Sequence, residues 1–176
     1  MTETGSSDGT FDFCADCPSH NNCCVRARPL GRVVESPFLL QRETEKIKEV
    51  FGIEVKNFAN ITADADGSKH FSLKDKDDGC IFYKNGACTV YNFRPLDCKI
   101  FPFDIIEDVS GSFFWIVYTE LCPVKFNFLK YFQSAKRLFE AANLSPQDIH
   151  HFASHAAGVM GKYRYRVIER LALPPP

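Results

Sequence analysis

The sequence lacks a long apolar run and an excess of either charge. No stretch approaches the roughly 18 uncharged apolar residues of a membrane span, and the run from Phe113 to Tyr118 is only as long as a strand. The 21 basic and 22 acidic residues give a net charge of −1, so no overall attraction to nucleic acid or to an anionic membrane is expected. We therefore expect neither a nucleic-acid nor a membrane partner, and a protein partner or substrate stays unidentified.

The sequence also lacks the common catalytic motifs. It contains no Gly-rich phosphate loop, no GxSxG elbow, no HExxH zinc motif and no paired-carboxylate motif. The acidic residues Asp75, Asp77 and Asp78 are typical of a solvated turn and not of a calcium loop. No acid, base or nucleophile can be named from the sequence, which leaves enzymatic activity open.

The N-terminus lacks a secretion signal. Residues 1–10 are polar and slightly acidic, with neither a basic start nor an apolar core. We expect a cytoplasmic location. Residues 1–13 have no hydrophobic periodicity and are rich in Gly, Ser and Thr, so they are predicted to form a disordered tail.

Cysteine, in contrast, is abundant. In the reducing cytosol, eight cysteines are better explained as metal ligands than as disulfides, although a disulfide scaffold is the rival interpretation. Eight thiols suffice for two tetrahedral tetrathiolate sites or for one iron–sulfur cluster with spare ligands. The candidate ligands are Cys14, Cys17, Cys23, Cys24, Cys80, Cys88, Cys98 and Cys122.

The spacing of the first four cysteines supports metal binding. Cys14 and Cys17 are separated by two residues, a spacing that aims two thiolates at one metal from a tight turn. Cys23 and Cys24 are adjacent, and in an extended backbone their side chains leave on opposite faces. They can therefore serve two neighbouring metals, or one of them can be a buried core residue. His20, in the same loop, is a further candidate ligand, with simple solvation as the alternative.

Other polar residues are weaker candidates for a role at a metal site. His151 and His155 are four residues apart, which places them on one face of a helix at a spacing that can hold a metal. Without an HExxH motif, packing or surface exposure is the better interpretation. Four basic residues close to cysteines are candidates to balance thiolate charge, with ordinary solvation as the alternative: Arg26, Arg28, Arg94 and Lys99.

The hydrophobic pattern predicts an α+β fold. A helix is expected from Phe38 to Phe51, opened by Ser36 and Pro37 and ended by Gly52. Two hairpins are expected next, the first around Asn85-Gly86 with strands 80–83 and 88–91, the second with strands 103–109 and 113–121. The first should bring Cys80 and Cys88 toward each other, and the second should place Cys98 and Cys122 just outside its strands. Helices are expected over 123–144 and, after a cap at Ser145, Pro146 and Asp148, as far as about Leu171.

The predicted organisation is a single domain. After the tail at 1–13, residues 14–125 form a cysteine-cluster metal-binding region, and residues 126–176 form a helical part of the same domain. Small antiparallel hairpins would thus surround a cysteine-ligated metal centre, with a helical C-terminal half.

Several motifs together resemble a known family. Cys14-x2-Cys17-x5-Cys23-Cys24 is followed by Gly79-Cys80-Ile81-Phe82, Gly86-x-Cys88-Thr89-Val90-Tyr91, Arg94-Pro95-x2-Cys98 and Phe101-Pro102. Over residues 14–125 this pattern resembles the YkgJ-type CxxCxxCC family of zinc- or iron-chelating proteins. The spacer between Cys17 and Cys23 is longer than is usual in that family. The resemblance implies a cysteine-ligated metal centre, and a distant resemblance to flagellin lysine methylases implies an iron–sulfur cluster, but neither implies a substrate.

Two hypotheses follow from the sequence. In the first, the cysteines bind an iron–sulfur cluster or zinc, and the centre supports redox or group-transfer chemistry. In the second, closed tetrathiolate sites form a structural zinc module that presents a partner-binding surface.

Overall fold

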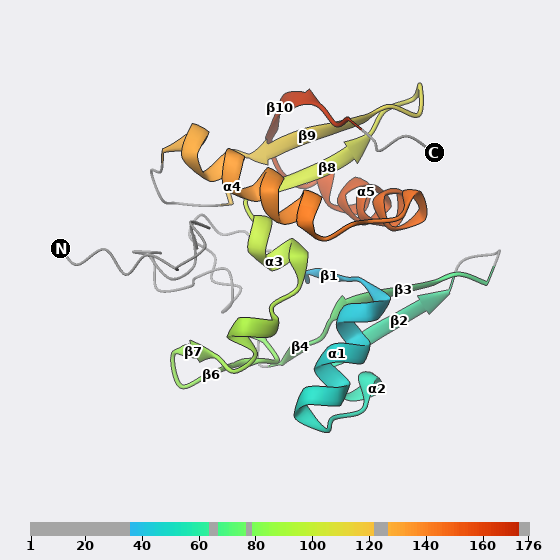
Figure 1. Cartoon of the computed structure of the whole chain (residues 1–176), viewed down its shortest axis with the longest axis vertical. Helices are drawn as coiled ribbons and strands as arrows, with labels where there is room; N and C mark the ends of the chain where they lie inside the picture. The colour runs from blue at the N-terminus through green and yellow to red at the C-terminus, as the bar shows by residue number, and fades with distance from the viewer. Residues whose placement is uncertain (1–35, 64–66, 77–78, 122–126, 173–176) are drawn as a thin grey trace.

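The computed structural model describes residues 36–63, 67–76, 79–121 and 127–172 (Figure 1). These residues form two three-stranded antiparallel sheets with helices packed beside them, and two smaller strand pairs. The predicted α+β class is therefore correct. The predicted tail at 1–13 lies outside the described residues.

The C-terminal layer contains one sheet and two helices. Its strands are β8 (Phe103–Glu107), β9 (Phe113–Tyr118) and β10 (Tyr165–Arg170), in the order β10-β9-β8. The helices α4 (Phe128–Ala141) and α5 (Pro146–Met160) pack beside this sheet (Figure 1). The hairpin of β8 and β9 confirms the second hairpin predicted from the sequence.

Aromatic side chains fill the core of this layer. The ring of Trp115, 1% exposed, lies edge-to-face against Phe132 at 5.6 Å and Phe139 at 5.1 Å between centroids. Both phenylalanines come from α4, at the helical spacing that the sequence showed. Phe152 of α5 continues the cluster and contacts Phe38 of the other layer at 5.5 Å. One aromatic cluster therefore spans both layers.

Local signals fix where these elements begin and end. The β8–β9 turn is closed by the Asp108 carboxylate, which accepts hydrogen bonds from the backbone N–H groups of Ser110 and Ser112, each at 2.9 Å. At the start of α5, the Ser145 hydroxyl accepts from the Asp148 N–H, and the Asp148 carboxylate accepts from the Ser145 N–H, both at 3.0 Å. This reciprocal cap confirms the predicted helix start.

The end of the chain differs from the prediction. Helix α5 ends at Met160, and the residues expected to continue it to about Leu171 instead form β10, which pairs antiparallel with β9. Tyr165, Val167 and Ile168 are residue types that favour strands, and the edge of β9 offers unpaired backbone groups. The C-terminal part is therefore mixed and not purely helical.

The N-terminal layer also contains one three-stranded sheet and two helices, but it is smaller. Its strands are β1 (Phe38–Leu39), β2 (Ala59–Ala63) and β3 (Lys69–Leu73), in the order β1-β3-β2. Helices α1 (Gln41–Phe51) and α2 (Val55–Phe58) accompany them (Figure 1). An apolar cluster, which we call the N-terminal core, is built from Leu39, Ile47, Phe58, Ala59, Phe71, Leu73, Phe82 and Val90.

Helix α1 confirms its predicted end and corrects its predicted start. Gly52 follows the helix in the left-handed conformation, with φ of 63°, as a C-terminal glycine commonly does. The N-cap is Leu40 and not Ser36, because Phe38 and Leu39 are drawn into β1 by pairing with Ser72 and Phe71 of β3.

Two carboxylates tie the short helix α3 (Leu96–Ile100) to the N-terminal layer. The backbone N–H of Leu96 donates to Oε1 of Glu43 at 2.7 Å, and the backbone N–H of Phe38 donates to Oδ2 of Asp97, also at 2.7 Å. Each bond joins residues more than 50 positions apart. We call this pair of bonds the carboxylate clasp, since it fixes α3 against both α1 and β1.

The Glu43→Gln substitution tests the clasp. Burial raises the pKa of Glu43, and the N–H groups of Leu40 and Leu96 oppose that shift because each donates to one oxygen. Glutamine turns an NH₂ group toward one of these two donors, so we expect a loss of about 1–3 kcal/mol in the free energy of unfolding, measured with urea. Glu45→Gln, on the exposed part of the same helix, is the matched control and should change little. Equal stability of the two variants would contradict the role of Glu43.

A second buried carboxyl lies within the C-terminal sheet. The hydroxyl of Tyr118 donates to Oδ2 of Asp104 at 2.8 Å, and both side chains are buried. Burial, reinforced by the nearby Asp97, raises the pKa of Asp104 well above its ordinary value of 3.8. Burial and the Asp104 carboxylate likewise raise the pKa of Tyr118. Folding therefore favours the protonated form of Asp104.

This preference makes stability depend on pH. Because the pKa of Asp104 is higher in the folded than in the unfolded chain, its contribution is fully present below the unfolded pKa and is lost as the pH rises through the folded pKa. We expect Asp104→Asn, which cannot ionise, to gain stability relative to the wild type as the pH rises from 5 to 8. Thermal unfolding of both proteins at several pH values measures this difference. A difference in stability between the two proteins that does not change with pH would contradict the raised pKa of Asp104.

Candidate metal centre

The structure describes three of the eight predicted ligands. Cys80 lies on β5 (Gly79–Cys80), Cys88 on β7 (Ala87–Cys88) and Cys98 in α3. Each of the three is partly buried, and no disulfide joins any two of them. The other predicted ligands, Cys14, Cys17, Cys23, Cys24 and Cys122, lie outside the described residues, as does His20.

The first predicted hairpin exists but is shorter than expected. Strand β6 (Tyr83–Lys84) pairs with β7 through a two-residue turn at Asn85 and Gly86, whose φ values of 52° and 82° suit the turn type that Asn-Gly favours. Tyr83, and not Cys80, stands opposite Cys88.

Cys80 belongs to a different strand pair. Strand β5 pairs with β4 (Asp75–Lys76), so that Cys80 stands opposite Asp75. The hairpin has only two paired residues on each side, and a turn at Ile81 and Phe82 separates it from Cys80. The predicted strand 80–83 is therefore shorter than expected, since Cys80 lies outside the hairpin and pairs with Asp75.

The three cysteines nevertheless meet at one body of apolar residues. Cys80, Cys88 and Cys98 all pack against the N-terminal core, together with Ile81 and Phe93. They reach it from two strand pairs and one helix, three elements that are separate in the chain. The N-terminal core thus supplies a common wall on which thiols from different elements are held.

The environment of Cys88 shows that its neighbours interact electrostatically. Burial raises the pKa of the Cys88 thiol, the backbone N–H of Val90 lowers it, the Cys80 thiol raises it and the positive charge of Arg94 lowers it. A metal cation bound at Cys88 would favour the thiolate form and so oppose the effect of burial.

The third thiol is positioned by a rigid turn and by the carboxylate clasp. Arg94 and Pro95 both have extended backbone geometry, and Pro95 is the N-cap of α3. The proline ring limits φ, so the segment that leads to Cys98 is stiff. Asp97, which precedes Cys98, accepts the bond from Phe38, so the clasp holds the helix that carries this thiol.

Sequence reasoning missed the clasp, although part of its signal was present. Glu43 is the third residue of α1, the position from which a glutamate commonly accepts from the N-cap N–H. That it also accepts from Leu96, 53 positions away, has no local signal.

The chemistry of the donors fits zinc or an iron–sulfur centre. Thiolate sulfur is the ligand that both prefer, and each of the three described thiols packs against the N-terminal core. Within residues 36–63, 67–76, 79–121 and 127–172, no group of three or more His, Cys, Asp or Glu side chains is arranged to hold a metal ion. A metal site that includes these cysteines would therefore need donors from outside those ranges.

The histidines of α5 do not form a ligand pair. Nε2 of His155 lies 3.1 Å from the carbonyl oxygen of Ser36, and its ring packs on Phe38. His151 instead contacts His70 of β3, with 4.3 Å between ring centroids. Both contacts lie between the two layers, which agrees with the packing interpretation.

Comparison with known proteins supports metal binding by the cysteines. Among the helices of the described residues, none is both long and apolar enough to cross a membrane. No curated protein and no solved structure matches the chain. A family model, CxxCxxCC, described as "Putative zinc- or iron-chelating domain", matches residues 13–123. That range holds all eight cysteines and covers more than half of the chain, so this protein belongs to the CxxCxxCC family of zinc- or iron-chelating domains.

Proposed function

We propose that this protein binds an iron–sulfur cluster or zinc through cysteines contributed by distant parts of the chain. The observation that supports it best is the meeting of Cys80, Cys88 and Cys98 on the N-terminal core from three separate elements. All three thiols are only partly buried, whereas a cysteine that merely fills space in a core is usually fully buried. The proposed ligands are Cys14, Cys17, Cys23, Cys24, Cys80, Cys88, Cys98 and Cys122.

The described residues contribute position and shielding to such a centre. Phe82 and Val90 are buried beside the thiols, and Phe93 packs against the same cluster. They limit the access of water to the sulfur atoms, which is one of the ways a protein tunes a metal site. A bound iron–sulfur cluster would add one-electron chemistry, so redox or group-transfer activity in the cytoplasm belongs to this proposal.

One observation favours a structural zinc module as the second candidate. Strands β4, β5, β6 and β7 have two residues each, and such short pairs are only marginally stable on their own. A closed zinc site that cross-links Cys80 and Cys88 would hold these pairs together.

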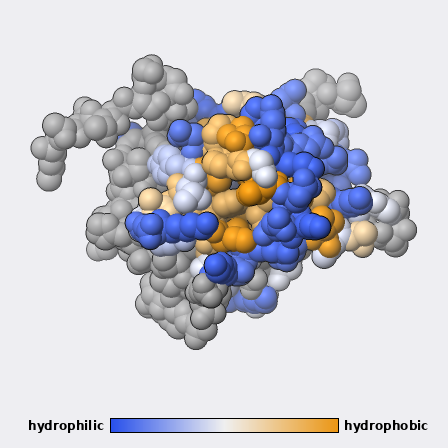
Figure 2. Space-filling view, turned by 90° about the horizontal axis from the view of Figure 1, so that it is seen from below, coloured by the Kyte–Doolittle hydropathy of each residue, from blue (hydrophilic) through white to orange (hydrophobic). Residues whose placement is uncertain are grey.

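The same region carries a surface on which a partner could dock. Seen from below, apolar surface lies between hydrophilic side chains (Figure 2). Val50 and Phe51, at the end of α1, are 42% and 38% exposed, and Phe51 contacts Phe93 with 5.7 Å between ring centroids. Contiguous apolar surface of this kind commonly marks an interaction site. It adjoins the short elements that the cysteines would cross-link.

Metal analysis of protein purified without oxygen separates the two candidates. An iron–sulfur centre predicts brown protein with visible absorption and acid-labile sulfide, because the cluster contains inorganic sulfide. The zinc module predicts colourless protein with stoichiometric zinc. About two equivalents of zinc without sulfide would overturn the iron–sulfur centre, and protein without metal would overturn both candidates.

A shared site predicts that distant cysteines are equally necessary. We expect Cys98→Ser and Cys17→Ser to lower the bound metal to a similar extent, at least tenfold at limiting metal, since a lost ligand affects the whole centre. Atomic absorption on the purified variants measures this. Ala87→Ser, an exposed position next to Cys88, adds a hydroxyl without removing a thiol and is the matched control. A normal metal content in Cys98→Ser would exclude that residue from the site.

A further inference from the structure

A buried arginine stands between two of the proposed ligands in the chain. Arg94 follows the 3₁₀ turn η1 (Tyr91–Phe93), six residues after Cys88 and four before Cys98. Its exposure is 8%, which is unusual for an arginine. A buried guanidinium needs compensating interactions, because removing a charge from water is costly.

Part of that compensation comes from Tyr91. The guanidinium carbon lies 3.8 Å from the centroid of the Tyr91 ring, and Nε of Arg94 donates to the carbonyl oxygen of Tyr91 at 2.9 Å. Stacking on the ring and the bond to the backbone fix the plane and the position of the guanidinium. Both interactions are made within the turn that links β7 to α3, the elements of Cys88 and Cys98.

The fixed charge follows a residue that packs on the same wall as the thiols. Phe93, the residue before Arg94, packs against the N-terminal core together with Cys88 and Cys98. A zinc ion with four thiolates carries a formal charge of −2, and an oxidised four-iron cluster with four thiolates carries about the same. Such an anionic centre beside an apolar wall requires a nearby cation. Arginine suits this role because it does not lose its proton and is weakly hydrated.

We propose that Arg94 is the built-in counter-charge of the cysteine centre, held by Tyr91 so that it strengthens the binding of a metal surrounded by thiolates. This inference rests on the proposed function and extends it. Arg94 is a positioning residue, since its charge acts on the ligands and not on a substrate. The fixed cation specifies a net-negative, thiolate-rich centre.

The test measures metal affinity in variants of the full chain. Reduced protein is titrated with Co²⁺ in competition with a chelator, and the sulfur-to-cobalt charge-transfer absorption reports the thiolates bound. We expect Arg94→Gln to bind Co²⁺ about 10- to 100-fold more weakly, the range typical of residues that support metal ligands. Arg94→Lys, which keeps the charge, should recover part of this loss. The absorption per bound cobalt should be unchanged in both variants, because all ligands are still present.

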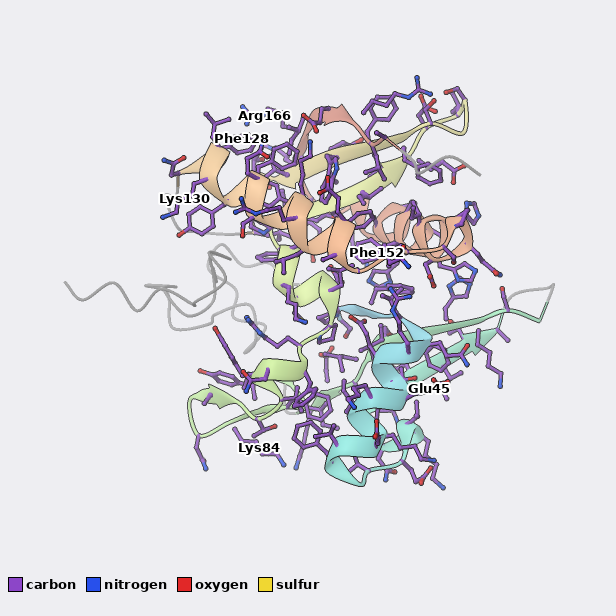
Figure 3. All side chains as sticks on the ribbon, viewed as in Figure 1. Glu45, Lys84, Phe128, Lys130, Phe152 and Arg166 are labelled. Carbon is purple, nitrogen blue, oxygen red and sulfur yellow. The ribbon has the colours of Figure 1, made fainter. Side chains whose placement is uncertain are left out.

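Lys84→Gln is the matched control. Lys84 is an exposed lysine of β6, opposite Ala87 in the hairpin that carries Cys88 (Figure 3). Removing its charge should change the affinity less than about twofold, because water and salt screen an exposed charge. A loss as large in Lys84→Gln as in Arg94→Gln would overturn the proposal, since net charge alone would then explain the effect. An unchanged affinity in Arg94→Gln would also overturn it.

A further variant covers the case in which Arg94→Gln does not fold. Tyr91→Leu keeps the guanidinium but removes the ring on which it stacks, and we expect affinity to fall about 3- to 10-fold. Fluorescence of the single, buried Trp115 in the other layer reports whether each variant is folded. Folded Tyr91→Leu with wild-type affinity would overturn the proposal. If the wild type itself binds no Co²⁺ and contains no metal, the proposed function fails, and this outcome is distinct from the failure of the role of Arg94.

Discussion

The carboxylate clasp is the constraint on which the arrangement of this molecule depends. Glu43 and Asp97 each accept a backbone N–H from an element far away in the chain, and together they hold α3 against α1 and β1. Helix α3 has five residues, too few to hold its position by its own hydrogen bonds. Because it carries Cys98 and leads directly into the C-terminal sheet, both the thiol and the sheet take their position from these two bonds. The partly buried Glu43 carboxylate, which accepts from two backbone groups, is costly to replace, and this makes the junction specific.

The candidate site combines weak local structure with strong anchoring. Strand pairs of two residues supply Cys80 and Cys88, whereas the N-terminal core behind them and the stacked Arg94 are well buried. Such an arrangement suits a metal site, because the ligands can adjust while their support stays fixed. The two proposed functions differ in the role of the metal. An iron–sulfur cluster would transfer electrons, whereas zinc would hold the short strand pairs in place.

The sequence predicted those parts of the fold that local signals determine. The glycine after α1, the Asn-Gly turn, the Ser145 cap and the β8–β9 hairpin each depend on a few adjacent residues, and each was found. The strand β10 was missed because its partner β9 lies about 50 residues earlier in the chain. The local sequence of β10 is compatible with either a helix or a strand, so only the pairing with β9 decides between them. The place of Cys80 outside the hairpin was missed because only the pairing of β5 with β4 determines it. The cysteines were proposed as ligands from their spacing and Arg94 from its place beside them, whereas the double role of Glu43 required the tertiary structure.

The position of β10 has a consequence for how the family should be delimited. The family model ends at residue 123, yet β9 is flanked by β10 and Trp115 is covered by α4, and both of these elements come later in the chain. The segment that sequence comparison recognises is thus smaller than the segment that folds. A protein cut at the boundary of the recognised domain would expose an aromatic sheet face and an open strand edge, two features that promote aggregation. Insolubility of such a fragment would therefore say nothing about its ability to bind metal.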